Sequence, residues 1–323
     1  MGNKNREKLK VLIIGAGCIA ALFDKPGDER VLTHAHAVWK SDGFELVGFV
    51  DPQIDKARAA AEVWGGKAFP DLVEAFGDER VDVAGIAVPD EFHYELLNEV
   101  ARYPVRLVLA EKPLTRTLEE AEKVRKLYAE IGRPVLVNYS RRFVPEFEDL
   151  KIKIQSGEFG RFLNGAGYYG KGFLHNGSHM VDLMRHLLGE PTGWKVTGAV
   201  EDFYGDDPSL SVSLEFGDEV RFSMLAVDCR AYTVFELDLL FEKKRVRIVD
   251  SGFSVEEYDM VENPVFKGYR RLEKGREYGT SFGVMMSLVY ENIFEHLSRG
   301  TGLKCSLEDA YRTMKLCEEV KRG

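Results

Sequence analysis

Closely spaced cysteines are missing from this sequence. The four cysteines, Cys18, Cys229, Cys305 and Cys317, stand far apart at irregular intervals, and no C-x-x-C pair occurs. Such pairs are the usual signature of structural zinc sites and of redox motifs, so we expect neither here. The sequence instead predicts reduced cysteines, most of them buried.

A surplus of basic residues and long apolar runs are missing as well. The formal net charge is -9, which disfavours nucleic acid as a partner because binding to a phosphate backbone needs clustered Lys and Arg. The longest apolar runs, VLIIGAGCIAALF and VRLVLA, are too short to span a bilayer, and no apolar signal-peptide core follows the start MGNKNREKLK. We therefore expect a cytoplasmic protein without nucleic-acid or membrane partners.

The length and the sequence pattern predict two domains. A chain of 323 residues exceeds the size at which a single core usually stops growing, and 45% hydrophobic with 30% charged residues is ordinary for a folded globular protein. The pattern of elements changes near residue 142. We therefore expect a dinucleotide-binding domain over residues 1–141 and a substrate-binding and oligomerisation domain over residues 142–323.

The first domain should hold a parallel sheet covered by helices on both faces. Strands that read as continuous apolar runs alternate with helical patterns, which is typical of a doubly wound Rossmann fold. The predicted strands are residues 10–15, 45–51, 81–89, 105–113 and 134–140, and the predicted helices follow the first strand and cover 55–65, 91–102 and 117–132.

The second domain should be an α+β domain with an open, mostly antiparallel sheet. Its strands are predicted near residues 194–202, 209–217, 219–227, 233–241 and 244–250, with hairpin turns at 216–218 and 241–244. Its helices are predicted near 143–160, 175–190, 281–300 and 306–321. Ser306, followed by Asp309, fits the N-cap of the last helix.

A glycine-rich turn follows the first predicted strand. Gly15, Gly17 and Ala20 form the pattern G-x-G-x-x-A between a strand and a helix, which is the context of the dinucleotide-binding fingerprint. Gly15 permits the tight turn, Gly17 lets backbone N–H groups approach a pyrophosphate, and Ala20 keeps the helix close to the sheet. We predict that these residues bind the cofactor together with Cys18 and Ile19.

Asp51 ends the second predicted strand. A carboxylate there can accept hydrogen bonds from the adenosine ribose and would repel a 2'-phosphate, so the sequence favours NAD over NADP. Asp51 lies further from the glycines than the usual ~20 residues. We interpret residues 22–37, LFDKPGDERVLTHAHA, as an insertion in the first strand-to-helix connection that forms a solvated loop.

Glu111, Lys112 and Pro113 follow the fourth predicted strand, at the edge where open α/β sheets bind ligands. A lysine beside a bound cofactor can hold an alkoxide or carbonyl oxygen by charge and hydrogen bonding. Pro113 would fix the backbone directly after it. Taken alone the tripeptide is a weak signal, because a lysine at the protein surface could occur in the same tripeptide.

The order of several short motifs gives a more specific signal. The chain contains GAGCIA, HAVWKSDGFELVGFVDP, IAVPDEFHYELL, AEKP, VNYSRRF, SGEFG, GSHMVDL and SLEDAYRTMKL in that sequence. In this order and spacing it resembles the family of glucose-fructose oxidoreductase, inositol dehydrogenase and the rhizopine catabolism protein (Gfo/Idh/MocA), over essentially its full length. The resemblance implies an oxidoreductase of sugars, cyclitols or their derivatives that uses NAD or NADP.

The resemblance also implies roles for individual residues. It makes Lys112 the active-site lysine and His179 the histidine of the G-x-H motif, and it places Val88, Pro89 and His93 in the cofactor pocket, with Glu111 beside Lys112. One departure is visible. Many relatives have an aspartate four residues before that histidine, whereas this chain has His175, followed by Asn176.

Residues 175–190, HNGSHMVDLMRHLLGE, allow three interpretations: a metal site, an acid-base site, or packing without chemistry. A zinc site needs about three protein ligands, and His175, His179 and Asp182 could meet only on one helix, which Gly177 interrupts. We therefore expect no metal. His179 is the predicted general base, since a neutral imidazole near a helix start can accept the hydroxyl proton.

The sequence also bears on the roles of two residues that follow His179. Asp182 would either orient the His179 ring or serve the helix end or a domain contact. His186, beside Arg185 in the last turns of the helix, is predicted to be a surface or capping residue.

The sequence thus predicts an NAD-dependent enzyme that moves hydride between nicotinamide and a secondary hydroxyl or keto carbon of a sugar, cyclitol or nucleotide-sugar derivative. Lys112 and His179 would be catalytic. Candidate substrate contacts are Tyr169, Arg142, His175 and Asn176, with Tyr168 and Arg141 beside them. An NAD-dependent glycosidase of the same fold and a non-catalytic metabolite sensor are the alternatives. The family resemblance further implies a homodimer or homotetramer formed through the sheet of the second domain.

Overall fold

The computed structural model describes residues 7–217 and 220–323, which form two compact units. The first unit contains Met1–Phe143 and Gly283–Arg312, and the second contains Val144–Phe282 and Thr313–Gly323. The first part of the chain therefore ends close to the expected boundary, but residues 283–312 return to it. Tyr290 shows why: its buried ring contacts Phe44 at a centroid distance of 5.3 Å, within the core of the first unit.

The first unit is built on a parallel six-stranded sheet, as predicted. Its strands are β1 (Leu9–Ile14), β2 (Phe44–Val50), β3 (Lys67–Phe69), β4 (Val83–Ile86), β5 (Leu107–Ala110) and β6 (Val135–Val137), in the order β3-β2-β1-β4-β5-β6. The short strand β3 was not predicted, because three residues are too few to give a pattern. Every residue of β4 and β5 is buried, which explains their continuous apolar sequences.

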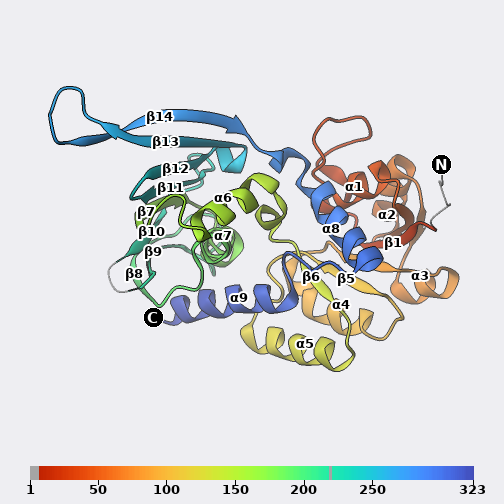
Figure 1. The fold of residues 1–323 in the computed structure, drawn as a ribbon. Helices are drawn as coiled ribbons and strands as arrows, with labels where there is room; N and C mark the ends of the chain where they lie inside the picture. Colours follow the sequence, from red (N-terminus) through yellow and green to blue (C-terminus); the bar gives the residue numbers. More distant parts are fainter. Residues whose placement is uncertain (1–6, 218–219) are drawn as a thin grey trace, which may run out of the picture. The chain divides into compact units, whose positions relative to one another are not determined.

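Helices cover both faces of this sheet. Figure 1 shows α4 and α5 on one face and α1 and α8 on the other. The helices of the first unit are α1 (His34–Lys40), α2 (Ile54–Trp64), α3 (Leu72–Asp78), α4 (His93–Val100), α5 (Leu118–Glu130) and α8 (Met285–Arg299), with a π-helical turn at Cys18–Leu22 and 3-10 turns at Asp90–Phe92 and Ser140–Phe143. A further 3-10 turn, Ser281–Val284, precedes α8.

The second unit holds the predicted open sheet, which has eight strands. They are β7 (Phe162–Tyr169), β8 (Gly193–Val200), β9 (Ser209–Glu215), β10 (Arg221–Ala226), β11 (Phe235–Phe241), β12 (Lys244–Val249), β13 (Ser254–Glu262) and β14 (Arg270–Gly279), in the order β14-β13-β12-β11-β7-β10-β9-β8. All neighbours are antiparallel except β7 and β10.

The predicted hairpin turns are present where they are described, but the last two strands were not predicted. β11 and β12 are joined through the predicted turn at 241–244. Phe216 N donates to Val220 O beside the predicted turn at 216–218, of which Asp218 lies outside the described residues. The hairpin of β13 and β14 was not predicted. Nearly all of β14 is exposed on both of its faces, so no alternation of apolar and polar residues marks it as a strand.

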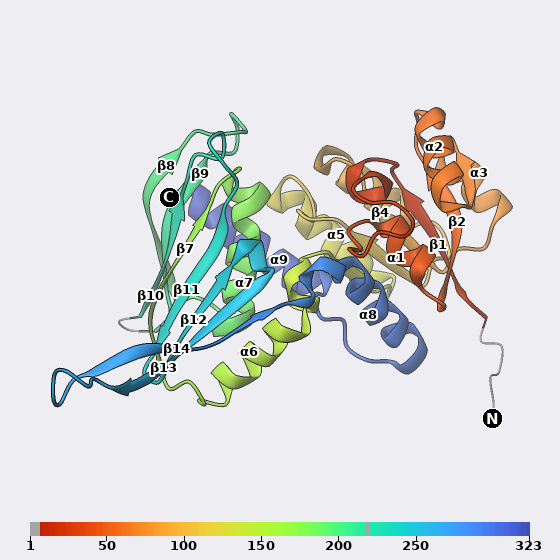
Figure 2. The same cartoon turned by 90° about the horizontal axis from the view of Figure 1, so that it is seen from above.

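One face of the second sheet is covered by helices. α6 (Pro145–Gln155) and α7 (Ser178–Leu188) lie against it in Figure 2. A π-helical turn at Phe173–Gly177 leads into α7, and a 3-10 turn, Asp250–Gly252, joins β12 to β13. Residues alternate along β11, where Leu237 and Leu239 are buried while Glu236 and Asp238 are half-buried. Ser306 directly precedes the final helix α9 (Leu307–Arg322), and its hydroxyl oxygen accepts a hydrogen bond from the N–H of Asp309 at 3.2 Å, as the predicted N-cap requires.

Candidate functional site

The residues predicted to bind the cofactor lie at the carboxyl edge of the first sheet. Strand register places Ile14, Ile86, Ala110 and Val137 in neighbouring positions, so the residues that follow them leave the sheet together. These following residues are Gly15, Ala87, Glu111 and Asn138. This is the edge at which open parallel sheets bind ligands.

The two glycines of the fingerprint have different surroundings. Gly15 has a φ of 102°, and a Cβ added there would collide with the carbonyl oxygen of Ala87. Gly15 therefore fits both the left-handed backbone and the close approach of β4. At Gly17 an added Cβ would meet nothing within 4 Å. The backbone at Gly17 is thus open on one side, which is the space a pyrophosphate needs.

The helix predicted after the glycines is shorter than expected. It consists of five residues, Cys18–Leu22, in π-helical geometry, and the next helix begins only at His34. Ala20 is fully buried, as its predicted contact with the sheet requires, while Cys18 is exposed. Because one short turn carries little macrodipole, any cofactor phosphate here would depend mainly on the local N–H groups.

The insertion at 22–37 is only partly the solvated loop that was expected. The buried Asp24 carboxylate accepts hydrogen bonds from the backbone N–H groups of Leu32 and Thr33, at 2.6 and 3.2 Å, and lies 3.0 Å from Nδ1 of His36. These contacts close the insertion at its base. Its first residues remain exposed, including Phe23 at 59%.

Asp51 anchors the glycine turn. Its Oδ2 accepts a hydrogen bond from the N–H of Ala16 at 3.2 Å, and its Oδ1 accepts one from the N–H of Gln53 at 2.9 Å. The side chain is half-buried. The carboxylate therefore stands beside the glycine turn at the end of β2, where a ribose contact was predicted.

Glu111 points into a buried network. Its Oε1 lies 3.0 Å from Nε2 of His34 and accepts a hydrogen bond from Nδ2 of Asn138 at 2.7 Å. The other nitrogen of His34, Nδ1, lies 3.1 Å from the hydroxyl of Tyr290. Burial acts to raise the pKa of Glu111, but the hydrogen bonds of His34 and Asn138 and the charge of Lys112 outweigh it and lower that pKa. The residue before Lys112 is therefore a buried carboxylate.

His93 joins two loops of the predicted cofactor pocket. Its Nδ1 lies 2.6 Å from the carbonyl oxygen of Pro113, and its Nε2 lies 3.0 Å from that of Val88. The ring is 1% exposed, while Pro89 is exposed and Val88 and Lys112 are half-buried. His93 thus connects the end of β4 to the lysine loop, and it would support a cofactor through these loops.

The second unit positions His179 at the start of α7. The π-helical turn ends at Gly177 and the helix begins at Ser178, so His175 precedes the helix and His179 is its second residue, as predicted. A Cβ at Gly177 would collide with the rings of Tyr169 and Phe173. The His179 side chain is half-buried. Within residues 7–217 and 220–323, no group of three or more His, Cys, Asp and Glu side chains has the arrangement to hold a metal ion.

Asp182 belongs to a buried network of α7 and α9. Its Oδ1 accepts a hydrogen bond from the hydroxyl of Thr313 at 2.8 Å and lies 3.9 Å from Nη1 of Arg185. Asp182 is 2% exposed and Thr313 is fully buried. This geometry gives Asp182 a structural contact between α7 and α9, which fits one of the two interpretations left open for it.

His186 differs from its prediction. It was expected at the surface or as a cap, but it is only 7% exposed, and its Nε2 lies 3.2 Å from Oε2 of Glu148 on α6. The sequence is misleading here because α7 is buried almost all round: Met184, Arg185 and Leu187 are buried as well. A charged or polar residue near a helix end is usually exposed, but not in a helix enclosed on its sides.

The predicted substrate contacts of the second unit fall into two groups. The backbone N–H of His175 donates to Oδ2 of Asp207 at 2.9 Å, and its ring lies beside that of Tyr204. Asn176 donates from Nδ2 to the carbonyl oxygen of Gly170 at 2.8 Å. Both side chains are half-buried, whereas Tyr169 is fully buried and donates its hydroxyl to Leu210 O. Tyr169 therefore has no exposed surface for a substrate.

Tyr168 and the two arginines also differ from the expected substrate contacts. Tyr168 lies on the other face of the sheet from α7, and both arginines are buried. Tyr168 alternates with Tyr169 along β7, so its half-exposed ring lies on the opposite face of the sheet from α7. Arg142 is 6% exposed, and its Nη1 lies 3.1 Å from Oδ1 of Asp309. Arg141 is 8% exposed, and burial lowers its pKa. These contacts give Arg142 a structural role at the start of α9.

Several residues with prominent contacts were not found from the sequence. They are His34, Asn138 and Tyr290 around Glu111, and Tyr204 and Asp207 around His175. The repeated histidines of THAHA were the one available signal for His34. The other partners lie far away in sequence, and no local pattern could reveal them.

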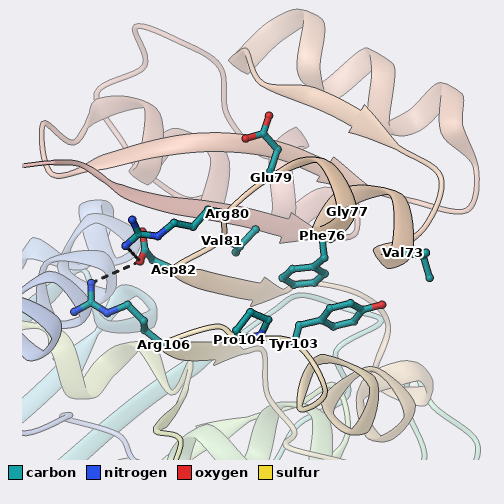
Figure 3. Close-up of a pocket in the computed structure, with 10 residues that line it drawn as sticks. All are labelled: Val73, Phe76, Gly77, Glu79, Arg80, Val81, Asp82, Tyr103, Pro104 and Arg106. Carbon is teal, nitrogen blue, oxygen red and sulfur yellow. Dashed lines mark hydrogen bonds and ion pairs between the residues drawn. The ribbon is translucent and has the colours of Figure 1, made fainter.

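A cavity of about 730 Å³ lies elsewhere in the first unit. Its lining includes the stacked rings of Phe76 and Tyr103, whose centroids are 4.0 Å apart. Figure 3 shows Arg80 and Arg106 both directed to Asp82, at 3.2 and 3.7 Å from its Oδ1. Asp82 and Arg106 precede β4 and β5, so this cavity opens at the amino edge of the sheet, away from Gly15 and Lys112. The guanidinium groups of Arg80 and Arg106 are both paired with Asp82.

Residues 9–139 match the model of an oxidoreductase family described by an NAD-binding Rossmann fold (GFO_IDH_MocA). An inositol 2-dehydrogenase of Corynebacterium glutamicum is 30% identical over 159 residues, which are 49% of this chain and 44% of that protein. A D-glucoside 3-dehydrogenase of Escherichia coli is 28% identical over 203 residues, 57% of this chain and 55% of that protein. The chain thus spans about half the length of the curated relatives it matches.

Solved structures show the same fold over nearly the whole chain. The UDP-N-acetylglucosamine 3-dehydrogenase GnnA of Acidithiobacillus ferrooxidans has a TM-score of 0.77 at 16% identity, with 98% of both chains covered. The WlbA dehydrogenase of Bordetella pertussis, in complex with NADH and UDP-GlcNAcA, has a TM-score of 0.75 at 18% identity, covering 98% of this chain and 96% of that one. No described helix has the length and apolar composition needed to cross a membrane. Residues 9–139 thus match the Gfo/Idh/MocA family of oxidoreductases, and the curated relatives of the chain are dehydrogenases.

Proposed function

We propose that the protein is an NAD-dependent oxidoreductase that acts on a secondary hydroxyl or keto carbon of a sugar, a cyclitol or a derivative of these. The observation that carries the proposal is the arrangement at the carboxyl edge of the first sheet. There Lys112 follows β5, two strands from the glycine turn that follows β1, and the buried carboxylate of Glu111 directly precedes it. A half-exposed cation beside a dinucleotide fingerprint is suited to a reacting oxygen.

The residues present fit a dinucleotide. The open side of Gly17 leaves room for a pyrophosphate near backbone N–H groups, and the Asp51 carboxylate stands at the end of β2 for the ribose hydroxyls. Bound NAD would supply the hydride acceptor or donor. The negative charge of Asp51 opposes a 2'-phosphate, so NAD is the proposed cofactor and NADP the weaker one.

Lys112 and His179 would divide the work on the substrate oxygen. Lys112 would stabilise the negative charge that develops on this oxygen, by charge and by hydrogen bonding. His179 would accept the hydroxyl proton during oxidation and return it during reduction. Glu111 would act through Lys112, because its own carboxylate faces His34 and Asn138.

Two further proposals follow from the resemblance to this family. The protein would form a homodimer or homotetramer through the face of the second sheet that lies opposite α6 and α7, where β11 presents Glu236 and Asp238. A glycosidase that oxidises its substrate transiently would use the same residues. It is distinguished by releasing a hydrolysed sugar without net NADH.

The proposal is tested by separating cofactor binding from turnover. NAD affinity is measured by titration, and NADH formation is measured with inositols and glucosides. The proteins are the native chain, Lys112→Ala and the control Lys126→Ala, at an exposed position of α5. Lys112→Ala should keep its NAD affinity and lose turnover by about 100-fold, the effect of removing one such contact. Unchanged turnover in Lys112→Ala would remove Lys112 from the mechanism.

A further inference from the structure

The connection between β8 and β9 carries two neighbouring aromatic rings beside His175. We call residues 201–208, EDFYGDDP, the aromatic loop. Phe203 and Tyr204 pack edge to face at a centroid distance of 4.7 Å, and Phe203 is 59% exposed. The Tyr204 ring lies 4.8 Å from the His175 ring, and its hydroxyl lies 3.5 Å from His175 Nε2. An exposed aromatic surface thus adjoins the residue that replaces the family's aspartate.

Two carboxylates hold the aromatic loop against the turn that carries His175. Asp207 accepts hydrogen bonds from the backbone N–H groups of Leu174 and His175, at 3.0 and 2.9 Å. Asp202 accepts one from the N–H of Lys171 at 2.5 Å and one from the Ser209 hydroxyl at 3.1 Å. The loop and the turn are therefore one connected structure within the second unit, and the position of Tyr204 beside His175 is built in.

The charge of the aromatic loop restricts its ligand. It contains Glu201, Asp202, Asp206 and Asp207 and no basic residue. Among the contacts described for it, the ammonium of Lys171 lies 5.1 Å from the centre of the Phe203 ring, and that of Lys321 lies 3.6 Å from Asp207. Negative charge is in excess, so a ligand that carries a diphosphate would be repelled.

We propose that Phe203, Tyr204 and His175 form a substrate subsite for an uncharged sugar or cyclitol ring. The flat aromatic faces take the apolar C–H face of the ring, and His175 and the Tyr204 hydroxyl meet its hydroxyl groups. The inference rests on the proposed function and narrows it: the substrate is a neutral polyol ring and not a nucleotide sugar. Tyr204 and Phe203 become specificity-determining residues.

Ligand-observed NMR tests the subsite without requiring turnover. Saturation-transfer titrations are run with NAD present, using myo-inositol, methyl β-D-glucoside and UDP-N-acetylglucosamine as probes. The proteins are the native chain, Phe203→Ala, Tyr204→Ala and the control Tyr269→Ala. Tyr269 is exposed and belongs to the connection that joins β13 to β14. At least one neutral ring should bind the native chain more tightly than the UDP compound does. Each loop variant should weaken that binding roughly tenfold, and the control should not.

Two further variants separate the contributions within the subsite. Phe203→Leu keeps an apolar side chain but loses the flat face, and should behave like Phe203→Ala. Tyr204→Phe keeps the ring and removes the hydroxyl beside His175, so it should lose less affinity than Tyr204→Ala. Thermal melting checks that each variant is folded, and the exposed Phe203 variants keep the test valid should Tyr204→Ala unfold.

Several outcomes would overturn the proposal. Tighter binding of UDP-N-acetylglucosamine, equal affinities in all variants, or no binding of either neutral ring to the native chain would each contradict the subsite. Failure of the proposed function looks different: a neutral ring would bind through Phe203 and Tyr204, yet no NADH would form with or without Lys112.

Discussion

The carboxylate of Glu111 lies 3.0 Å from Nε2 of His34, a residue that is 77 positions away in the sequence. His34 is the first residue of α1, at the end of the insertion that follows the glycine turn. The insertion therefore supplies the buried partner of the residue that precedes Lys112. Asn138, at the end of β6, completes the contact from the other side.

Glu111→Gln should destabilise the protein by about 3 kcal/mol at neutral pH, because it breaks a buried charged contact while leaving its partner in place. The pKa of Glu111 is lowered in the folded protein, so its contribution is complete above the unfolded-state value of about 4.3 and is lost as pH falls through the lower folded value. Urea unfolding from neutral to acid pH should therefore show the variant's deficit shrinking only in acid.

The exposed Glu119 provides a control for this measurement, since its ion pair with Lys123 lies at the surface. Glu119→Gln should leave the free energy of unfolding nearly unchanged, because solvent screens an exposed ion pair. A Glu111→Gln variant as stable as Glu119→Gln at neutral pH would contradict the role assigned to the His34 contact.

Asp51→Asn should reduce the proposed preference for NAD over NADP. The amide oxygen can still accept the hydrogen bond from Ala16 N–H, so the glycine turn is retained while the charge that opposes a 2'-phosphate is removed. Titration of both cofactors into the native protein and the variant measures the change. Asp51→Ala would lose the charge and the anchor together. The argument fails if the native protein binds NADP more tightly than NAD.

His179 and His175 should fail differently when each is replaced by alanine. His179→Ala should abolish turnover over the whole pH range, because it removes the proposed general base. His175→Ala should mainly raise KM, because it removes a contact present both before and during the reaction. A pH-rate series on both variants decides between them, and the assignment is reversed if His175→Ala is inactive while His179→Ala keeps its rate.

Thr313→Val should destabilise the second unit without changing the pH profile of turnover. The substitution leaves Asp182 without its 2.8 Å hydrogen bond in a fully buried position, which costs about 1–3 kcal/mol. Thr301→Val, at an exposed threonine after α8, serves as the control. Denaturant unfolding and pH-rate measurements are made on the same samples. A displaced pH profile in Thr313→Val would show that Asp182 also orients His179.

The sequence predicted helices and strands correctly where one face of the element, or the whole strand, is buried. β4 and β5 are apolar throughout and were recognised, and α7 begins where Gly177 and Ser178 suggested. The hairpin of β13 and β14 was not found, because charged residues lie on both faces of β14. Local pattern carries information only where burial imposes a period.

The site shows the same limit. Gly15, Asp51 and Lys112 could be selected because a fingerprint, a strand end and a family motif mark them. The contact of His34 with Glu111 could not be, because it depends on how the insertion folds back. Tyr169 was selected for its hydroxyl, but the alternation of residues along β7 places its side chain in the core. There the hydroxyl donates a hydrogen bond to the carbonyl oxygen of Leu210.

The most direct measurement of the central claim follows a label from substrate to cofactor. The native protein and Lys112→Ala are incubated with NAD and either myo-inositol or methyl β-D-glucoside carrying deuterium on the ring carbons, and the nicotinamide is analysed by mass spectrometry. The account predicts deuterium in the reduced cofactor of the native protein and about 100-fold less in the variant. Released glucose without labelled cofactor would instead indicate a glycosidase, and an absence of label with both substrates would contradict the proposed oxidation of a neutral polyol ring.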